Sequence, residues 1–274
     1  MLSEDDLVAA IAAVAGEARR GVEVGIGDDA CVLAGGLVAS TDMLVDGVHF
    51  DAARMSAADI GHRAAAASLS DMAAMGAEPV CLLASFGVPA GYAAVADLAA
   101  GMAEHGVVLA GGDLCRSPAL VVSVTALGRA ERPVLRSGGR PGDLLVVTGT
   151  LGGQAASGYT ARVTPRLAEG RALAAVATAM LDLSDGIATD VRRLAAASGT
   201  GAVVELERLP LAPGATVEQA ATGGEDYELL AAVPAGVAAP VAVTVVGRLT
   251  DAGAVALVDA GGVPRALHGW DHFA

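Results

Sequence analysis

The chain has 274 residues and a formal net charge of −14 at pH 7, from 31 acidic and 17 basic residues. This acidity argues against a nucleic-acid partner, because nucleic-acid phosphates require a basic surface. All of the basic residues are arginine, so P-loop, protein-kinase and Schiff-base sites that depend on a lysine are excluded.

Hydrophobic residues make up 54% of the sequence, but Asp, Glu, Arg, Gly or Pro interrupts every apolar stretch. No stretch of 18 apolar residues exists, and the start "MLSEDDLVAA" is acidic where a secretory signal is basic. We therefore predict a cytoplasmic protein without a membrane partner. Cys31, Cys81 and Cys115 are odd in number and widely spaced, which favours packed thiols over disulfides or a zinc site.

The first half alternates helices and strands with short connections. Ser3 and Asp6 precede an apolar run and predict a capped N-terminal helix. Residues 56–76 predict one long helix, with Ser56 as its N-cap and Gly76 at its end. The other expected elements are a buried strand at 37–41 that ends at Asp42, strands at 80–88, 107–110 and 120–128, and a helix near 91–105.

The stretch "RPVLRSGGRPGD" (132–143) concentrates Gly, Pro and Arg, which indicates a domain boundary near residue 135. We therefore expect two domains, residues 1–135 and 136–274. The second half repeats the mixed pattern: strands at 144–149, 179–183 and 243–250, a helix after residue 186, and a glycine turn that leads into a strand within 222–233.

Acidic residues recur beside Val, Leu, Ala and Gly, where an uncompensated carboxylate is costly. Mg²⁺ takes oxygen ligands and is commonly shared between carboxylates and substrate phosphates. One shared metal cluster would therefore explain all of these acids together. They are Asp28, Asp29, Asp42, Asp71, Asp113, Asp182 and Asp185.

Several of these acids have a simpler interpretation. Asp28 or Asp29 can shape a turn after glycine, Asp113 can end a turn, and Asp185 can cap the following helix. Asp71 is harder to explain in this way, because helix interiors disfavour Asp. We favour the metal cluster, since the simpler interpretations would have to hold independently at each position.

Two glycine-rich segments follow strands, "LAGGDLCRS" and "VTGTLGG", and are interpreted as flexible turns whose backbone N–H groups can approach phosphate oxygens. Arg116 and Arg136 lie near them in the sequence and can clamp a phosphate. A solvated linker charge remains the alternative for Arg136.

Eight motifs, in order from residue 25 to the C-terminus, resemble the thiamine-monophosphate kinase family, which belongs to a superfamily with aminoimidazole ribonucleotide synthetase. They are "GIGDDACVL", "STDMLVDGVHF", "SLSDMAAMGAEP", "AGGDLCRSP", "RSGGRPGDLLVVTGTLGG", "LDLSDGIATD", "TGGEDYELL" and "GWDHF".

The resemblance implies an α+β protein with two mixed α/β domains of PurM-like architecture: an N-terminal ferredoxin-like, dimer-barrel domain and a C-terminal α/β sandwich. It implies ATP-dependent phosphorylation of thiamine monophosphate to thiamine diphosphate by direct in-line transfer, without a covalent catalytic residue, in a homodimer. By motif position the metal ligands would be Asp29, Ser40, Thr41, Asp42, Asp71, Asp113, Asp182 and Asp185. ATP would lie at Gly112, Asp113, Arg136 and Ser184, and thiamine monophosphate at His49, Glu225 and Trp270.

Trp270 is the only tryptophan, and an indole ring suits stacking on a cationic heteroaromatic ring. Its alternative role is an anchor of the chain end in a surface groove. His49 can equally be a packing residue before Phe50. The family motifs favour the substrate-binding role for both residues.

The chain departs from the family pattern at five positions. Leu114 and Cys115 replace two threonines, Ser68 replaces asparagine, Arg63 replaces lysine and Gly153 replaces aspartate. These changes bear on the rate and on the ATP loop more than on the reaction class, because the acidic positions are kept.

Two other functions remain open. The first is a non-catalytic nucleotide- or metal-binding relative, for which the changes at Leu114 and Cys115 leave room. The second is another ATP-using member of the superfamily. Selenophosphate synthetase needs a cysteine near its N-terminus and the hydrogenase maturation protein one at its C-terminus, whereas here the first cysteine is Cys31 and the chain ends "DHFA".

Overall fold

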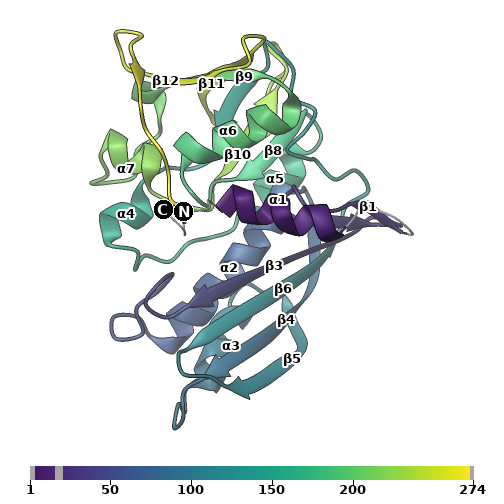
Figure 1. The fold of residues 1–274 in the computed structure, drawn as a ribbon, viewed down its shortest axis with the longest axis vertical. Coiled ribbons are helices and arrows are strands. Elements are labelled where there is room, and N and C mark those ends of the chain that lie inside the picture. Colours follow the sequence, from purple (N-terminus) through teal and green to yellow (C-terminus); the bar gives the residue numbers. More distant parts are fainter. Residues whose placement is uncertain (1–3, 16–20, 272–274) are drawn as a thin grey trace.

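Two β-sheets, each with its own helices, build the protein (Figure 1). The computed structural model describes residues 4–15 and 21–271, so Ser3, the expected cap of the first helix, lies outside the described residues. The mixed α/β architecture expected from the sequence is present. The boundary expected near residue 135 falls between the last strand of the first sheet and the first strand of the second, and the division into domains stays a prediction.

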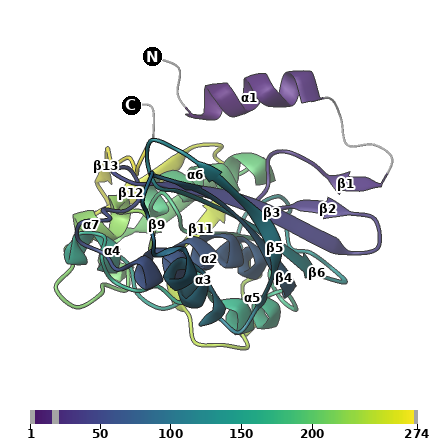
Figure 2. The same ribbon diagram turned by 90° about the horizontal axis from the view of Figure 1, so that it is seen from below.

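The first sheet has the strand order β1-β2-β3-β6-β4-β5, with β4 and β5 parallel and the other neighbours antiparallel. Helices α2 and α3 pack together, and α2 covers one face of this sheet (Figure 2). The strands are β1 (Val22–Val24), β2 (Cys31–Leu33), β3 (Leu37–Val45), β4 (Glu78–Val88), β5 (Val108–Arg116) and β6 (Val121–Arg129), and the helices are α1 (Glu4–Ala15), α2 (Ala57–Ala74) and α3 (Val95–Ala103).

The second sheet has the strand order β13-β12-β9-β11-β7-β10-β8. Helix α6 packs against β8 and β9, and α5 packs against α2 of the first half. The strands are β7 (Leu144–Val147), β8 (Ala179–Asp182), β9 (Gly201–Glu205), β10 (Leu229–Val233), β11 (Thr244–Thr250), β12 (Val255–Val258) and β13 (Pro264–Arg265). The helices are α4 (Gly153–Ser157), α5 (Leu167–Leu173), α6 (Ile187–Ser198), α7 (Val217–Thr222) and the 3₁₀ turn η1 (Leu206–Arg208).

Helix α2 begins as the sequence predicts, because the Ser56 hydroxyl accepts a hydrogen bond from the backbone N–H of Asp59 over 3.1 Å. Its small residues allow close packing on several sides. A Cβ added at Gly61 would lie 1.9 Å from the carbonyl oxygen of Leu98 in α3, so only glycine permits this helix contact. The burial of α2 between the two sheets is what carries Asp71 into the interior.

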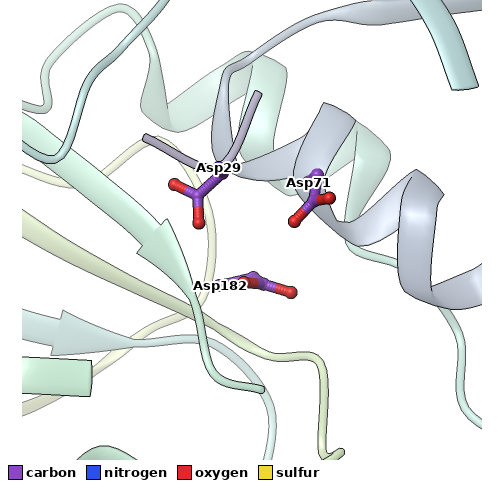
Figure 3. Close-up of side chains that lie close together, drawn as sticks. All are labelled: Asp29, Asp71 and Asp182. Carbon is purple, nitrogen blue, oxygen red and sulfur yellow. The ribbon is translucent and has the colours of Figure 1, made fainter. Parts of the chain in front are cut away.

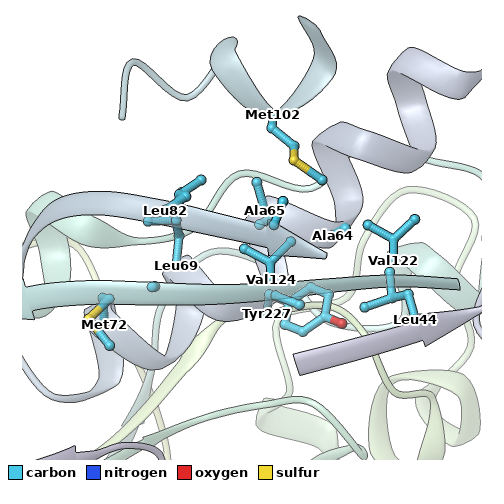
Figure 4. Packing of buried hydrophobic residues seen from close by; sticks show 14 of the residues in the cluster. Leu44, Ala64, Ala65, Leu69, Met72, Leu82, Met102, Val122, Val124 and Tyr227 are labelled. Carbon is cyan, nitrogen blue, oxygen red and sulfur yellow. The ribbon is translucent and has the colours of Figure 1, made fainter. Parts of the chain in front are cut away.

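The core around α2 includes a residue of the second half. Tyr227, which precedes β10, belongs to the core cluster of the first half, where Figure 4 shows it near Leu44 and Val124. Ala73 and Ala74 of α2 in turn pack against residues of the second half, namely Val146, Leu173 and Met180. The two sheets are therefore joined through α2, and the loops that precede β10 reach the same region.

Three sequence-based expectations are wrong. Strand β3 continues to Val45, so Asp42 lies inside the strand and not at its end. Residues 111–113 form no turn, because β5 continues through them in parallel with β4. Gly112 is needed there for close strand contact, since an added Cβ would lie 1.7 Å from the carbonyl oxygen of Ala84. Cys115 is exposed on this edge strand and not packed in a core.

Among the described residues, the structure contains no helix with the length and apolar character needed to cross a membrane.

Candidate active site

Three acids from distant parts of the chain meet where the two sheets adjoin. Asp29 lies in the turn before β2, Asp71 in α2, and Asp182 at the end of β8 (Figure 3). One carboxylate oxygen from each lies within 4.8 Å of the others. Asp29 and Asp182 are buried and Asp71 is partly buried. This convergence is the central feature of the site.

The acids of this cluster destabilise one another's ionised forms. The pKa of Asp71 is raised well above its usual value, first by burial and then by the charges of Asp42, Asp182 and Asp29. The pKa of Asp182 is likewise raised by burial and by Asp29. A cation bound among these carboxylates would relieve both effects.

Strand β3 contributes two further polar groups to the cluster. The hydroxyl of Ser40 donates to the carboxylate of Asp71, and Asp42 accepts a hydrogen bond of 2.7 Å from Ser68. Burial raises the pKa of Asp42. Thr41 differs, because alternation along the strand turns its hydroxyl to the opposite face, where it lies 3.0 Å from that of Thr125.

Arg136 brings a positive charge to the cluster. Its Nη2 donates to Oδ1 of Asp29 over 2.7 Å, and its backbone N–H donates to Oδ2 of Asp28 over 3.1 Å. Burial and the neighbouring Asp29 raise the pKa of Asp28 to about 6. Asp28 therefore fixes the backbone of Arg136 while Asp29 faces the other acids, which gives the two adjacent carboxylates different roles.

The turn after β8 holds a second acidic group. Asp185 pairs with Arg193 of α6, and its backbone N–H donates to the buried Asp190 over 3.1 Å. Burial and Asp185 raise the pKa of Asp190 to about 8. Gly186 is the N-cap of α6, so Asp185 does not take the capping role that the sequence left open. Arg193 was not singled out from the sequence.

The acids line a cavity of about 810 Å³. His49, Glu225 and Trp270 line the same cavity, as expected for residues of one site. The ring Nδ1 of His49 accepts from the backbone N–H of Val45 over 3.1 Å. Trp270 is 52% exposed, and its backbone N–H donates to the carbonyl oxygen of Asp185 over 2.9 Å. The cavity also includes Thr41, Asp42, Arg136, Ser184 and Asp185.

Two residues expected at the ATP site lie elsewhere in this chain. Asp113 lines a separate cavity of about 310 Å³ together with Arg116 and Ser123. In the strand register Asp113 is next to the exposed Ser85, on the face of the sheet opposite α2. Gly112 is exposed on the same edge strand. Within one chain, the structure does not bring Gly112 and Asp113 to the acidic cluster.

Arg63 lies behind the cavity wall and contacts residues that line the cavity. In the sequence it was noted only because it replaces a lysine of the family pattern. Its side chain is 2% exposed and pairs with Glu225. A charge inside the alanine-rich run of α2 is the same kind of signal that singled out Asp71. Tyr159 also lines the cavity and was not predicted.

The fold and the site define the class of the protein. Residues 27–130 match the family model of the AIR synthase related protein, N-terminal domain. A solved structure, "AaThiL complexed with AMPPCP and TMP", has 28% identity and a TM-score of 0.89, and covers 99% of this chain and 97% of its own. The hydrogenase maturation protein HypE shares the fold at 19% identity, with a TM-score of 0.70 and coverage of 88% of this chain and 91% of its own.

Curated relatives make the assignment narrower. The thiamine-monophosphate kinase of Halobacterium salinarum is 40% identical, over 90% of this chain and 94% of the relative. That of Salmonella typhimurium is 37% identical, over 79% of this chain and 78% of the relative. The chain therefore belongs to the thiamine-monophosphate kinase family, an enzyme family, which confirms the resemblance found in the sequence.

Proposed function

We propose that this protein transfers the γ-phosphate of ATP to thiamine monophosphate and so forms thiamine diphosphate and ADP. The observation that carries this proposal is the convergence of Asp29, Asp71 and Asp182 within 4.8 Å in a large cavity. A phosphoryl transfer between two anionic substrates needs such a site, where positive charge can be gathered around both phosphates. Membership of the thiamine-monophosphate kinase family supports this substrate pair.

The donor set fits Mg²⁺. Oδ2 of Asp29 is buried and, among the described residues, has no hydrogen-bond partner. The raised pKa values of Asp71 and Asp182 indicate carboxylates that lack sufficient positive charge nearby. Bound Mg²⁺ would neutralise phosphate charge during the transfer. Within one chain we propose as ligands Asp29, Ser40, Asp42, Asp71, Asp182 and Asp185. Asp113 would join them only from a second subunit, and the Thr41 hydroxyl, which faces Thr125 on the other side of β3, is not part of this set.

Arg136 and Ser184 are proposed to contact ATP. Both line the cavity, and the guanidinium of Arg136 already lies against the acidic cluster. A planar guanidinium can bond two oxygens of one phosphate, which makes it a suitable anchor beside metal-bound phosphates. Gly112 and Asp113 are proposed to join the nucleotide site from a second subunit, because Asp113 lies on the face of the first sheet opposite α2 and Gly112 adjoins it on the exposed edge strand.

That opposite face is suited to a homodimer. Met43, Leu83 and Val108 lie there and are 58%, 38% and 65% exposed. A second copy packed on this face would bury these apolar side chains and cover β5, the edge strand that carries Asp113. We therefore propose that two copies pair through their first sheets.

Thiamine monophosphate is proposed to bind beside His49, Glu225 and Trp270. Its thiazolium ring is cationic, and a carboxylate with an indole ring offers both charge attraction and a stacking surface. The partly exposed Trp270 ring and the Glu225 carboxylate line the same cavity as the acidic cluster. The phosphate of the substrate can then point to the cluster while its rings occupy the rest of the cavity.

The chain needs no covalent intermediate for this reaction. An oxygen of the acceptor phosphate attacks the γ-phosphorus, the bond to the bridging oxygen of ADP breaks, and ADP leaves with that oxygen. The substrate phosphate is already ionised at neutral pH, so no general base is required. Arg136 holds the donor and Glu225 orients the acceptor, which places the two phosphates for in-line transfer.

A single assay tests the proposal. The protein is incubated with ATP, Mg²⁺ and thiamine monophosphate, and thiamine diphosphate and ADP are quantified by chromatography. We expect equal amounts of both products and none with free thiamine as the acceptor. Binding of ATP without formation of thiamine diphosphate would instead identify a non-catalytic relative, and preference for free thiamine would identify a different kinase.

A further inference from the structure

The guanidinium of Arg63 contacts three separate segments of the chain, around residue 49, within residues 154–161 and at residue 225. Its Nη1 donates to the carboxylate of Glu225 and to the carbonyl oxygen of His49, the latter over 3.4 Å. Its Nη2 donates to Oε1 of Gln154 over 2.7 Å and to the carbonyl oxygen of Tyr159 over 2.8 Å. Arg63 is therefore a single buried charge that joins α2 to the turn before β10 and to the loop after α4.

The segments that Arg63 contacts form part of the cavity wall. His49, Tyr159 and Glu225 all line the cavity, whereas Arg63 does not. Arg63 thus lies behind the wall and supports it from the protein side. A residue in this position acts on a ligand only through the groups that it holds.

Two of these wall residues adopt a backbone conformation that needs support. Tyr159 has a φ of 61° and Glu225 a φ of 63°, in the left-handed region that residues other than glycine rarely adopt. Such conformations persist where surrounding contacts fix them, and they often occur at functional sites. Arg63 bonds to the carbonyl of the first residue and to the side chain of the second.

We infer that Arg63 is a positioning residue for the acceptor substrate: it fixes the Glu225 carboxylate and the Tyr159 backbone so that together they receive a cationic heteroaromatic ring. The inference rests on the function proposed above and deepens its account of the acceptor site. Arginine suits this role, because its planar fork of five N–H donors can reach several fixed acceptors at once. Lysine has three donors on one nitrogen and can satisfy fewer of these acceptors.

The test compares Arg63→Met and Arg63→Lys with a matched control, Arg162→Met. Arg162 lies in the same loop region and pairs with Asp59 and Glu104, but it is half exposed and does not line the cavity. Steady-state kinetics give KM for thiamine monophosphate and for ATP separately. Calorimetry gives the Kd for thiamine monophosphate without ATP, and thermal melting reports folding.

We expect Arg63→Met to raise KM and Kd for thiamine monophosphate by about tenfold or more, because a charge-assisted contact that orders Glu225 is lost. KM for ATP should stay within about twofold of the wild-type value. Arg63→Lys should restore part of the acceptor affinity, since it keeps the charge beside Glu225. Arg162→Met should change the melting temperature without changing either KM.

A double variant separates positioning from folding. If Arg63 acts through Glu225, the effect of Arg63→Met should depend on that carboxylate. Arg63→Met should then raise the acceptor Kd much less when Glu225 is replaced by Gln than when Glu225 is present. The Glu225→Gln background also removes the unpaired carboxylate, so the double variant should fold even if Arg63→Met alone does not. Equal effects in both backgrounds would overturn the inference, as would an unchanged acceptor Kd in Arg63→Met. A wild-type protein that makes no thiamine diphosphate would refute the proposed function instead, and the calorimetric Kd would still decide the role of Arg63.

Discussion

Arg136 donates to one oxygen of Asp29 over 2.7 Å, while the other oxygen of the same carboxylate is buried without a hydrogen-bond partner among the described residues. One arginine thus faces three converging carboxylates, Asp29, Asp71 and Asp182. When these acids are ionised, the cluster keeps an excess of negative charge. That excess of negative charge lowers the free energy of unfolding of the metal-free protein.

Mg²⁺ should stabilise the protein in the absence of substrates. A ligand that binds only the folded state at 100 times its Kd adds about 2.7 kcal/mol to the free energy of unfolding. For a chain of this size we expect the melting temperature to rise by about 5 °C or more. Differential scanning fluorimetry with MgCl₂, against NaCl of equal ionic strength, measures the effect, and equal shifts with both salts would contradict it.

Asp71→Asn should stabilise the metal-free protein and abolish its activity. The pKa of Asp71 is raised in the folded state, so at any pH above the usual pKa of an aspartate the folded protein must either hold a buried charge or take up a proton, and both cost free energy. A neutral amide removes this cost, and the free energy of unfolding at about pH 8 should rise by about 1–3 kcal/mol. Urea denaturation in EDTA measures the change.

The control for this variant is Asp251→Asn, because Asp251 is exposed between β11 and β12 and does not line the cavity. Its effect on the metal-free stability should stay within about 0.5 kcal/mol. The stabilisation by Mg²⁺ should largely disappear in Asp71→Asn. A metal-free Asp71→Asn protein that is less stable than the wild type would show that the carboxylate has a structural role.

Arg136→Met should weaken the use of ATP more than that of the acceptor. The guanidinium is proposed to bond the phosphates of ATP, and loss of a charge-assisted hydrogen bond to phosphate raises KM for ATP by about tenfold to a hundredfold. Arg132→Met is a suitable control, because Arg132 is exposed and does not line the cavity. Equal KM values for ATP in both variants would exclude Arg136 from the nucleotide site.

The convergence of Asp29, Asp71 and Asp182 could be predicted from the sequence, because each is a carboxylate in apolar surroundings and needs a common compensating charge. The start of α2 was equally predictable, since the Ser56 cap is a local signal. The cap depends on neighbouring residues, whereas the rule about buried acids gives candidates without their positions: it also selected Asp113, which lies outside the cluster of its own chain.

The prediction of a turn at 111–113 is wrong because strand pairing is not local. The two glycines look like a turn, but the parallel contact with β4 extends β5 and makes glycine necessary at position 112. The same limit applies to Asp42, which lies inside β3 because its strand pairs with β6 as far as Val45.

The role of Arg63 could not be predicted from the sequence either. The residues that it contacts lie on segments that are distant in the chain and meet only in the fold. The sequence offered one usable signal, a charged residue in the alanine-rich helix that also carries Asp71. That signal identifies a buried charge but not its partners.

The affinity for thiamine monophosphate should fall as the pH is lowered through about 6. Burial raises the pKa of Glu225 to about 6, although the charge of Arg63 opposes the shift. Below this value the carboxylate is protonated and no longer attracts a cationic ring, so KM for the acceptor should rise by up to about tenfold between about pH 7 and pH 5. The acceptor phosphate titrates in the same range, with a pKa of about 6.

The variant Glu225→Gln isolates the contribution of the carboxylate, because an amide cannot ionise. The KM of this variant for the acceptor should be high at every pH and should vary less with pH than that of the wild type. Parallel profiles for the two proteins would show that the pH dependence belongs to the substrate and not to Glu225.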